Sequence, residues 1–353
     1  MSFYIPYAGS HTDPIDVAVV GASGTVGQKV LALSAHLPWM RITEMAGSNA
    51  RANAPLSSCP WREVLPMPKA LSSLRFCTMD DISAPYILSC LPNDVAEIYE
   101  PLWAKKGQHV FSNASTFRMS PDVPLLVPEI NAHHLSLIHQ QKTRGKRVNN
   151  PNCSATALAC ALFPILRNHS VRHISIVTLQ SVSGAGYPGI SSMDILGNTI
   201  PNIPGEADKI VQELQKILGS GDQALCTPIT VNVHRVPVLY GHSATIHILL
   251  DQPAPDVADL YHQFNQNHPI FALHDGDDRP QALRDLSHDD MRIHMGPIHT
   301  DALGSDSSVI ALNILSHNLV RGAAGAVLAN LACFLNAGHG DALNPEPRAD
   351  FSQ

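Results

Sequence analysis

One cysteine in this sequence has the surroundings of a catalytic nucleophile. Cys153 follows Asn150-Pro151-Asn152 and precedes the apolar stretch 155–166, which its residue spacing predicts to be a helix. The free backbone N–H groups and the dipole at a helix N-terminus stabilise a thiolate. Cys160 and Cys333 lie inside apolar runs, so they fit the alternative of a buried structural thiol. We therefore predict that Cys153 is the nucleophile and that its pKa lies below that of a free thiol.

Three glycines near the start of the sequence have the spacing of a dinucleotide-binding turn. Gly21, Gly24 and Gly27 follow the apolar run 15–20 and open a stretch with helical spacing. Without side chains, such positions let backbone N–H groups and a helix N-terminus approach a pyrophosphate. A plain glycine turn is the alternative, but the position between a strand and a helix favours a bound cofactor.

The end of the second predicted strand, 41–46, indicates which dinucleotide is bound. NAD-binding domains often place an acidic residue there against the ribose hydroxyls. This sequence instead has Ser48 and Arg51, whose hydroxyl and guanidinium suit a 2′-phosphate. We therefore predict NADP, bound by Gly21, Ser23, Gly24, Thr25, Val26, Gly27, Ser48 and Arg51.

The order of predicted elements indicates two domains and an α/β protein. Strands alternate with helices such as 95–106 in the first part, which favours a doubly wound parallel sheet with strands at 15–20, 41–46, 86–91 and 109–112. The second part favours an α+β domain on a largely antiparallel sheet, with strands at 174–181, 229–239 and 243–250 and helices at 208–218 and 255–265.

These elements set the expected domain boundaries. We expect an N-terminal extension at 1–14 and a Rossmann-type NADP-binding domain at 15–150, completed by a helix at about 318–336. A catalytic and dimerisation domain follows at 151–317, and a mobile tail at 337–353.

Composition excludes several classes of function. The 353 residues carry a net charge of −7, which gives no basic surface for nucleic acid, and no apolar run approaches the length that crosses a membrane. Seven scattered cysteines without a CxxC pair indicate a reducing compartment, so we expect a cytoplasmic protein. The 19 histidines show no metal-ligand spacing, so no metal is predicted.

Several motifs together resemble the aspartate-semialdehyde dehydrogenases, and among them the archaeal and fungal branch. They occur in the order of that family from residue 15 to about 335. The segments are 21–27, Ser112-Asn113-Ala114-Ser115-Thr116-Phe117-Arg118, 127–131, 150–154, 183–189, 205–209, 234–238 and 321–325.

This resemblance implies a fold and a reaction. The second domain would be like the C-terminal domain of glyceraldehyde-3-phosphate dehydrogenase. The reaction would be the reversible, NADPH-dependent reductive dephosphorylation of L-4-aspartyl phosphate to L-aspartate 4-semialdehyde, in lysine, threonine and methionine biosynthesis. Cys153 would carry the thioacyl group, His242 would be the acid/base, and Gln180 would orient the substrate.

The resemblance also implies the substrate-binding residues. Arg235 would hold the α-carboxylate by a bidentate pair and Glu206 the amino group. Inorganic phosphate would be bound by Lys209, Arg118 and Asn113. Ser183, Gly184 and Asn318 would lie near the nicotinamide. The chain would form a homodimer or homotetramer, with the apolar face of the second sheet covered by a partner.

The sequence departs from the family at three places. Tyr240 and His317 stand where the family usually has acids, and 295–299 replaces a Gly-Arg-x-Arg stretch. A reductase of the malonyl-CoA or N-acetylglutamyl-phosphate type is therefore an alternative, as is a catalytically silent NADP-binding homologue. Glu206 discriminates among the substrates because a carboxylate suits a free ammonium group.

Overall fold

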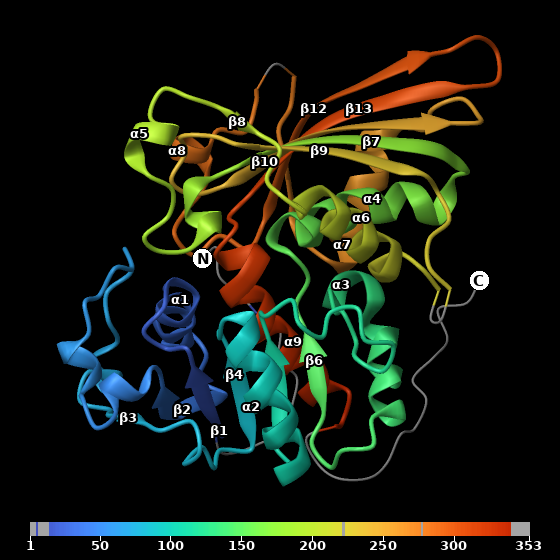
Figure 1. Ribbon diagram of the computed structural model, residues 1–353. Helices are drawn as coiled ribbons and strands as arrows, with labels where there is room; N and C mark the ends of the chain where they lie inside the picture. The colour runs from blue at the N-terminus through green and yellow to red at the C-terminus, as the bar shows by residue number, and fades with distance from the viewer. Residues whose placement is uncertain (1–4, 6–13, 221–222, 277, 340–353) are drawn as a thin grey trace.

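Six parallel strands form the first sheet, in the order β3-β2-β1-β4-β5-β6. The computed structural model describes residue 5 and residues 14–220, 223–276 and 278–339 (Figure 1). The strands are β1 (Ile15–Val20), β2 (Met40–Ala46), β3 (Phe76–Cys77), β4 (Tyr86–Ser89), β5 (His109–Ser112) and β6 (Arg147–Asn149). The order reverses between β1 and β4, and in open sheets of this kind dinucleotides bind at the carboxyl ends of those strands.

Helices cover both faces of this sheet. On one face, Val30 of α1 (Thr25–Ser34) and Leu331 of α9 (Gly325–Asn336) pack with Val17 and Val19. On the other face, Trp103 of α2 (Asn93–Lys106) packs with Ala18 and Val20. These residues alternate along β1 with Val17 and Val19, so their side chains point to the opposite face. The red α9 in Figure 1 thus returns from the second sheet to the first.

The second sheet has seven strands in the order β11-β12-β13-β10-β7-β9-β8. Four of its six pairings are antiparallel, and β7 with β9 and β11 with β12 are parallel. The sheet is therefore largely antiparallel, as expected, with two parallel pairings that the sequence did not predict. The strands are β7 (Val171–Gln180), β8 (Ile200–Pro201), β9 (Ile229–Arg235), β10 (His242–Leu250), β11 (Phe271–Leu273), β12 (Ile293–Ala302) and β13 (Ser308–Ser316).

Three helices pack on one face of this second sheet. They are α4 (Cys153–Asn168), α6 (Glu206–Ile217) and α7 (Val257–Asn267), and their apolar side chains share one core with alternate residues of β7 and β10 (Figure 1). Short helices complete the fold: α3 (Pro128–Asn131), α5 (Ser192–Ile195), α8 (Ala282–Asp285), a π-helical turn at Val320–Ala324, and 3₁₀ turns at Asn49–Arg51, Leu56–Ser58, Lys69–Leu71, Ala132–Gln140 and Val182–Ala185.

The predicted α/β class and the Rossmann-type first sheet are confirmed. Two long strands, β12 and β13, were not predicted, and the strand expected at 229–239 ends at Arg235. The expected extension falls outside the described residues except for Ile5 and Pro14, and residues 340–353 of the expected tail also lie outside them.

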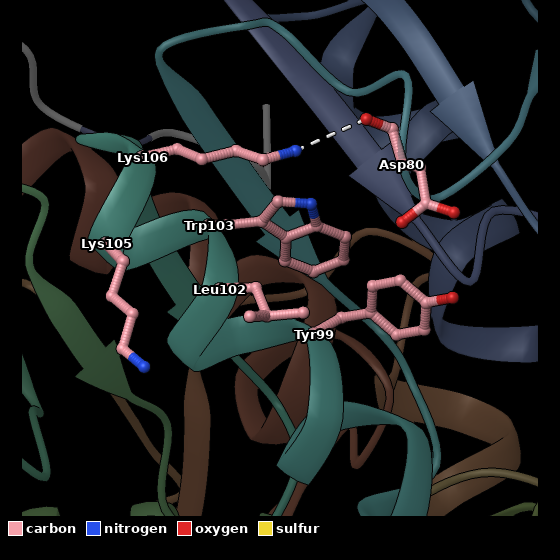
Figure 2. Close-up of a pocket in the computed structure, with 6 residues that line it drawn as sticks. All are labelled: Asp80, Tyr99, Leu102, Trp103, Lys105 and Lys106. Carbon is pink, nitrogen blue, oxygen red and sulfur yellow. Dashed lines mark hydrogen bonds between the residues drawn. The ribbon is translucent and has the colours of Figure 1, made fainter.

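Within the described residues, no helix combines the length and apolar character needed to cross a bilayer. Nor do these residues bring three His, Cys, Asp or Glu side chains together as metal ligands. A groove of about 330 Å³ lies on α2, where Tyr99 and Trp103 are close and Lys106 donates to the main-chain oxygen of Asp80 (Figure 2). None of the residues that line this groove belongs to the site predicted around Cys153.

Candidate active site

Cys153 is the first residue of α4, as the sequence predicts. Asn152 caps this helix, and its Oδ1 accepts hydrogen bonds from Ser154 N–H at 2.8 Å and Ala155 N–H at 3.4 Å. The sulfur lies 3.1 Å from Nε2 of His242, the first residue of β10. Gly322 packs closely against the cysteine: a Cβ there would lie 2.6 Å from Cys153 Cβ. Three segments far apart in the sequence thus fix the thiol.

The hydrogen bonds of His242 determine which nitrogen carries its proton. The backbone N–H of Ser181 donates to Nδ1 at 3.0 Å, so Nδ1 is an acceptor. The neutral ring therefore carries its hydrogen on Nε2 and presents it to Cys153 Sγ. Burial lowers the pKa of His242 to about 3, with a further contribution from the Arg235 charge. In this arrangement the imidazole is a neutral hydrogen-bond donor to the sulfur.

Burial dominates the acidity of the thiol. Burial, and after it the Glu206 carboxylate, raise the pKa of Cys153 to about 12, although the Arg118 and Arg235 charges oppose this. The expected depressed pKa is therefore wrong for this arrangement, because desolvation of the thiolate outweighs the charges and the helix terminus. Ionisation of the thiol then depends on positive charge brought close to it.

Two polar side chains beside the thiol share one carboxylate oxygen. Glu206 Oε1 accepts from Asn152 Nδ2 at 2.8 Å and from Gln180 Nε2 at 3.3 Å. Glu206 opens α6, Gln180 ends β7, and Gln180 is buried. The carboxylate is thereby held at the edge of the site, where it can meet a cationic group.

Arg235 places a second cation near the sulfur. It ends β9, is buried, and donates from Nη1 to the main-chain oxygen of Ser181 at 2.7 Å. Gly184 lies directly over it: a Cβ on Gly184 would be 2.9 Å from Arg235 Nη1 and 3.1 Å from His242 Nε2. The backbone at Gly184 therefore approaches both site residues closely, and a side chain at this position would have to displace Arg235 and His242.

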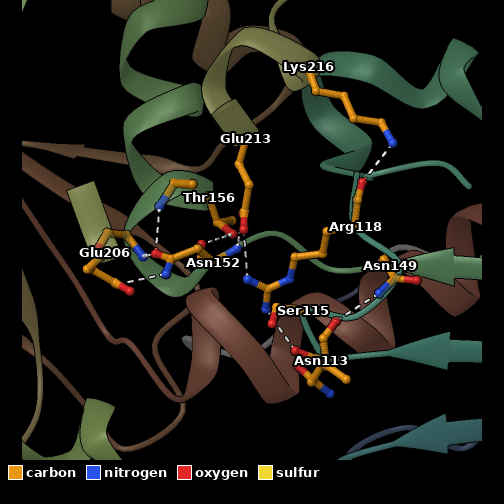
Figure 3. A network of polar contacts seen from close by, with 12 residues as sticks. Asn113, Ser115, Arg118, Asn149, Asn152, Thr156, Glu206, Glu213 and Lys216 are labelled. Atoms are coloured by element: carbon orange, nitrogen blue, oxygen red, sulfur yellow. Dashed lines mark hydrogen bonds and ion pairs between the residues drawn. The ribbon is translucent and has the colours of Figure 1, made fainter. Parts of the chain in front are cut away.

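Arg118 supplies a third charged side chain, after Glu206 and Arg235, and belongs to the network of polar contacts in Figure 3. Its Nη1 pairs with Glu213 Oε1 at 2.9 Å and its Nη2 donates to the main-chain oxygen of Asn113 at 2.8 Å. The remaining N–H groups of the fork are left for an anion. Lys216 ties the same loop to α6 by donating to the main-chain oxygens of residues 118, 120 and 123 at 2.7 to 2.9 Å.

Three further predicted residues, Asn113, Lys209 and Asn318, lie around this network. The Asn113 side chain donates to the main-chain oxygen of Ser89 and accepts from Asn150, so it braces the loop. Lys209 is exposed on the first turn of α6, away from these contacts. Asn318 is buried and joins two loops, donating to Ser183 Oγ at 2.9 Å and accepting from Gly241 N–H at 3.0 Å.

The predicted glycine turn lies at the switch point of the first sheet. Gly21 has a φ of +73°, and a Cβ there would lie 2.3 Å from the main-chain oxygen of Cys90, just after β4. A groove of about 260 Å³ opens over the N-terminus of α1. The N-cap residue of this helix is Gly24, so no side chain caps its first N–H groups. It is lined by Ser23, Gly24, Thr25, Val26, Gln28, Arg62, Cys90, Gly186 and Tyr187. Free backbone donors and small residues at this place fit the pyrophosphate of a dinucleotide.

The residues predicted for the 2′-phosphate lie beside this turn. Gly47 is in contact with Ser23, since a Cβ on Gly47 would lie 3.4 Å from its Oγ. Ser48 follows it and is exposed, and Arg51 is half-buried one turn later. A hydroxyl and a guanidinium therefore stand at the end of β2, where the adenosine ribose lies in folds of this kind.

Both halves of the chain match family models. Residues 16–138 match the semialdehyde dehydrogenase NAD binding domain, and residues 162–321 match the semialdehyde dehydrogenase dimerisation domain. The chain belongs to the semialdehyde dehydrogenase family.

Relatives of this semialdehyde dehydrogenase confirm the predicted resemblance. The aspartate-semialdehyde dehydrogenase of Methanothermobacter thermautotrophicus is 36% identical over 341 residues, which is 90% of this chain and 97% of that protein. The NADP malonyl-CoA reductase of Metallosphaera sedula is 29% identical over 353 residues, 93% of this chain and 98% of that protein.

A solved structure of the family agrees with the fold. The crystal structure of aspartate semialdehyde dehydrogenase with NADP from Candida albicans superposes with a TM-score of 0.80 at 28% identity. The match covers 91% of this chain and 99% of that chain. The relationship therefore includes both domains.

Tyr240 and His317, where the resemblance leads one to expect acids, lie near His242 in this semialdehyde dehydrogenase. The rings of Tyr240 and His317 are 5.4 Å apart, and burial lowers the pKa of His317 to about 3. His317 Nδ1 accepts from Leu319 N–H at 3.3 Å. Among the described residues, Ser181 rather than an acid is hydrogen-bonded to Nδ1 of His242.

Residues of the site that the sequence did not identify are Ser181, Glu213 and Gly322. Glu213 could have been found, because it is an acid on the apolar side of α6 between Ile210 and Leu214. Ser181 and Gly322 act through contacts between distant segments, which no local pattern reports.

Proposed function

We propose that this semialdehyde dehydrogenase catalyses the reversible, NADPH-dependent reductive dephosphorylation of L-4-aspartyl phosphate to L-aspartate 4-semialdehyde, a step toward lysine, threonine and methionine. The observation that carries the proposal is the Cys153 thiol at a helix N-terminus, 3.1 Å from His242 and near the charges of Arg118, Arg235 and Glu206. A nucleophile beside two cations and one carboxylate suits a substrate with a phosphate, a carboxylate and an ammonium group.

The first step forms the thioester. The Cys153 thiol loses its proton to solvent water, the thiolate attacks the acyl carbon, a C–S bond forms, and the C–O bond to phosphate breaks. Arg118 carries the N–H groups that can hold the departing phosphate, while Arg235 holds the α-carboxylate and Glu206 the ammonium. His242 donates Nε2–H first to the thiolate and then to the oxyanion that forms beside it.

The second step releases the aldehyde. NADPH, when bound, supplies the hydride that reduces the thioester carbon. The resulting thiohemiacetal oxyanion collapses, the C–S bond breaks and the thiolate returns to Cys153. A full acid/base role for His242 requires Ser181 N–H to release Nδ1, since imidazolium carries a hydrogen on both nitrogens.

The residues of the first domain fit NADP. The turn at Gly21 and the α1 N-terminus would hold the pyrophosphate, with Ser23, Thr25 and Val26 lining the groove. Ser48 and Arg51 would bind the 2′-phosphate, and Ser183 and Gly184, joined to Asn318, would face the nicotinamide. Lys209 and Asn113 would contribute to phosphate binding from the edge of the site. Lys209 would have to change its rotamer to do so.

We also infer a homodimer or homotetramer in the cytoplasm. Val177, Leu249 and Val309 point from β7, β10 and β13 to the face opposite α4 and are half-exposed, so a partner sheet can cover them. All seven cysteines are free, which suits a reducing compartment. A monomeric mass in solution at micromolar concentration would contradict the oligomer.

The deciding experiment is NADP reduction by the purified protein with L-aspartate semialdehyde, with and without inorganic phosphate, beside Cys153→Ser. We expect phosphate-dependent turnover that the variant loses. In Glu206→Gln the KM for the aldehyde rises sharply, because the ammonium loses its carboxylate partner. Turnover of malonyl-CoA in place of aspartate semialdehyde would overturn the proposed substrate and leave the thioester chemistry in place.

A further inference from the structure

Glu213 connects the nucleophile helix to the proposed phosphate-binding arginine. Its Oε1 pairs with Arg118 Nη1 at 2.9 Å, and its Oε2 accepts from the backbone N–H of Asn152. Figure 3 shows the carboxylate between the two. Arg118 belongs to the loop after β5 of the first sheet, and Asn152 caps the helix that Cys153 opens.

The carboxylate lies where an ordinary helix would place an apolar residue. Glu213 is only 3% exposed and shares the buried side of α6 with Ile210, Leu214 and Ile217. Burying a charge costs free energy unless it is paired and hydrogen-bonded. Both oxygens of Glu213 have such partners, Arg118 and the backbone N–H of Asn152. The two contacts that compensate for burying the carboxylate therefore also connect it to the residues around Cys153.

The place of the Arg118 guanidinium depends on these contacts. Its Nη2 bonds the loop's own backbone at Asn113, whereas Nη1 bonds Glu213 on another element. Its Nε is buried and has no hydrogen-bond partner among the described residues. Among the described residues, Glu213 makes the one side-chain hydrogen bond from the second domain to this guanidinium, and it also bonds the N-cap of α4, so it links the guanidinium directly to the nucleophile helix.

We propose that Glu213 is a positioning residue that holds Arg118 at the distance from Cys153 that an acyl phosphate requires. This inference rests on the phosphate role of Arg118 under the proposed function. One carboxylate then sets two positions at once: the guanidinium for the phosphoryl oxygens and the N-cap of the nucleophile helix. Glu213 itself touches no substrate.

Substitution of Glu213 should separate phosphate binding from aldehyde binding. Glu213→Gln keeps the shape of the side chain but replaces one carboxylate oxygen with an NH₂ group. This NH₂ group cannot accept a hydrogen bond, so either Arg118 or the backbone N–H of Asn152 loses its acceptor. We expect the KM for phosphate to rise about tenfold or more, as for loss of a charge-assisted hydrogen bond, with a small change in the KM for the aldehyde. Glu213→Asp keeps the charge but moves it away from Arg118 by one methylene group, so we expect a smaller rise in the KM for phosphate.

A double-mutant cycle tests whether Glu213 acts through Arg118. In an Arg118→Met background, Glu213→Gln should leave the KM for phosphate unchanged, because the guanidinium it positions is absent. Tyr261→Phe is the matched control for stability: it removes a buried bond of 2.6 Å to the α4 main-chain oxygen of Ala161, away from the site. A KM for phosphate that is unchanged in Glu213→Gln, or additive effects in the cycle, would overturn the proposal.

A second readout does not depend on turnover. Inorganic phosphate should slow alkylation of Cys153 by iodoacetamide in the wild-type protein, followed by mass spectrometry of the Cys153 peptide. Glu213→Gln should lose this protection and Tyr261→Phe should keep it. Protection that persists in Glu213→Gln overturns the inference, and no protection in the wild-type protein overturns the phosphate role of Arg118 and the inference with it. Protection without turnover of aspartate semialdehyde contradicts only the proposed substrate.

Discussion

The carboxylate of Glu206 lies close enough to Cys153 to oppose ionisation of its thiol. We expect Glu206→Gln to lower the pKa of Cys153, because a negative charge beside the thiolate is removed. At a fixed pH below that pKa, alkylation of Cys153 by iodoacetamide should be about tenfold faster, which corresponds to one pKa unit.

Two variants control this prediction. Asp208→Asn removes an equal charge from an exposed position on the same helical turn and should leave the rate unchanged. Arg235→Met should slow alkylation, because the Arg235 charge favours the thiolate. A Glu206→Gln protein that reacts no faster than the wild type would show that Glu206 does not control the thiol.

Gly184→Ala should impair catalysis by contact alone. The added Cβ would lie 2.9 Å from Arg235 Nη1 and 3.0 Å from His242 Cε1, so both side chains must move. Because small displacements of reacting groups are costly, we expect kcat to fall by about 100-fold while the melting temperature changes little. Steady-state kinetics and thermal unfolding measure the two. Gly197→Ala, where a Cβ meets nothing within 4 Å but the φ of +68° disfavours a side chain, should lower the melting temperature and keep wild-type kcat.

Local patterns in the sequence predicted four of the six strands of the first sheet and the helix that Cys153 opens. The apolar run at Ile15–Val20 and the glycine turn after it depend on neighbouring residues only, and so does the helix that Cys153 opens. β12 was missed because Pro297 and Gly296 interrupt it. The structure accommodates them where the register with β13 shifts between Met295 and Ile298, and a shift of that kind depends on the partner strand.

The acidity of the site could not be predicted in the same way. A helix N-terminus before Cys153 indicates a stabilised thiolate, but the pKa also depends on burial by Gly322 and on the charge of Glu206. These residues come from segments far along the chain. The expected identity of the nucleophile therefore depended on neighbouring residues in the sequence, whereas its pKa depends on contacts with distant segments.

Lys29 and Glu63 form a buried ion pair within the first domain, and the same lysine also contacts the second domain. Lys29 Nζ lies 2.6 Å from Glu63 Oε1 and donates to the main-chain oxygen of His288 at 2.8 Å. Burial lowers the pKa of Lys29. We expect Lys29→Met to reduce the free energy of unfolding by about 3 to 5 kcal/mol, because Glu63 is left buried without its partner.

The pair should behave as a unit in urea denaturation. Glu63→Gln added to Lys29→Met should cost less than the sum of the two single changes, because the uncompensated charge is gone. Strict additivity in a double-mutant cycle would contradict this coupling between Lys29 and Glu63.

His317 should make the protein sensitive to acid. Its pKa is about 3 when folded and about 6.5 in an unfolded chain, so between these values the unfolded state binds one more proton. Stability is therefore lost as pH falls from 6.5 toward 3. In His317→Asn, whose amide oxygen can accept the Leu319 N–H, the loss of unfolding free energy between pH 7 and pH 5 should shrink by up to about 2 kcal/mol. Equal pH dependence in both proteins would contradict this.

The contact between Gly322 and Cys153 has a consequence for biosynthesis. The neighbouring bond from Asn150 Nδ2 to the main-chain oxygen of Ala323 spans 173 residues of sequence. On the ribosome, the cysteine emerges long before the segment that will pack against it. Until that segment arrives, the thiol lacks its cover and is open to oxidants and electrophiles of the cell, so the newly made chain is more vulnerable to poisoning than the mature enzyme.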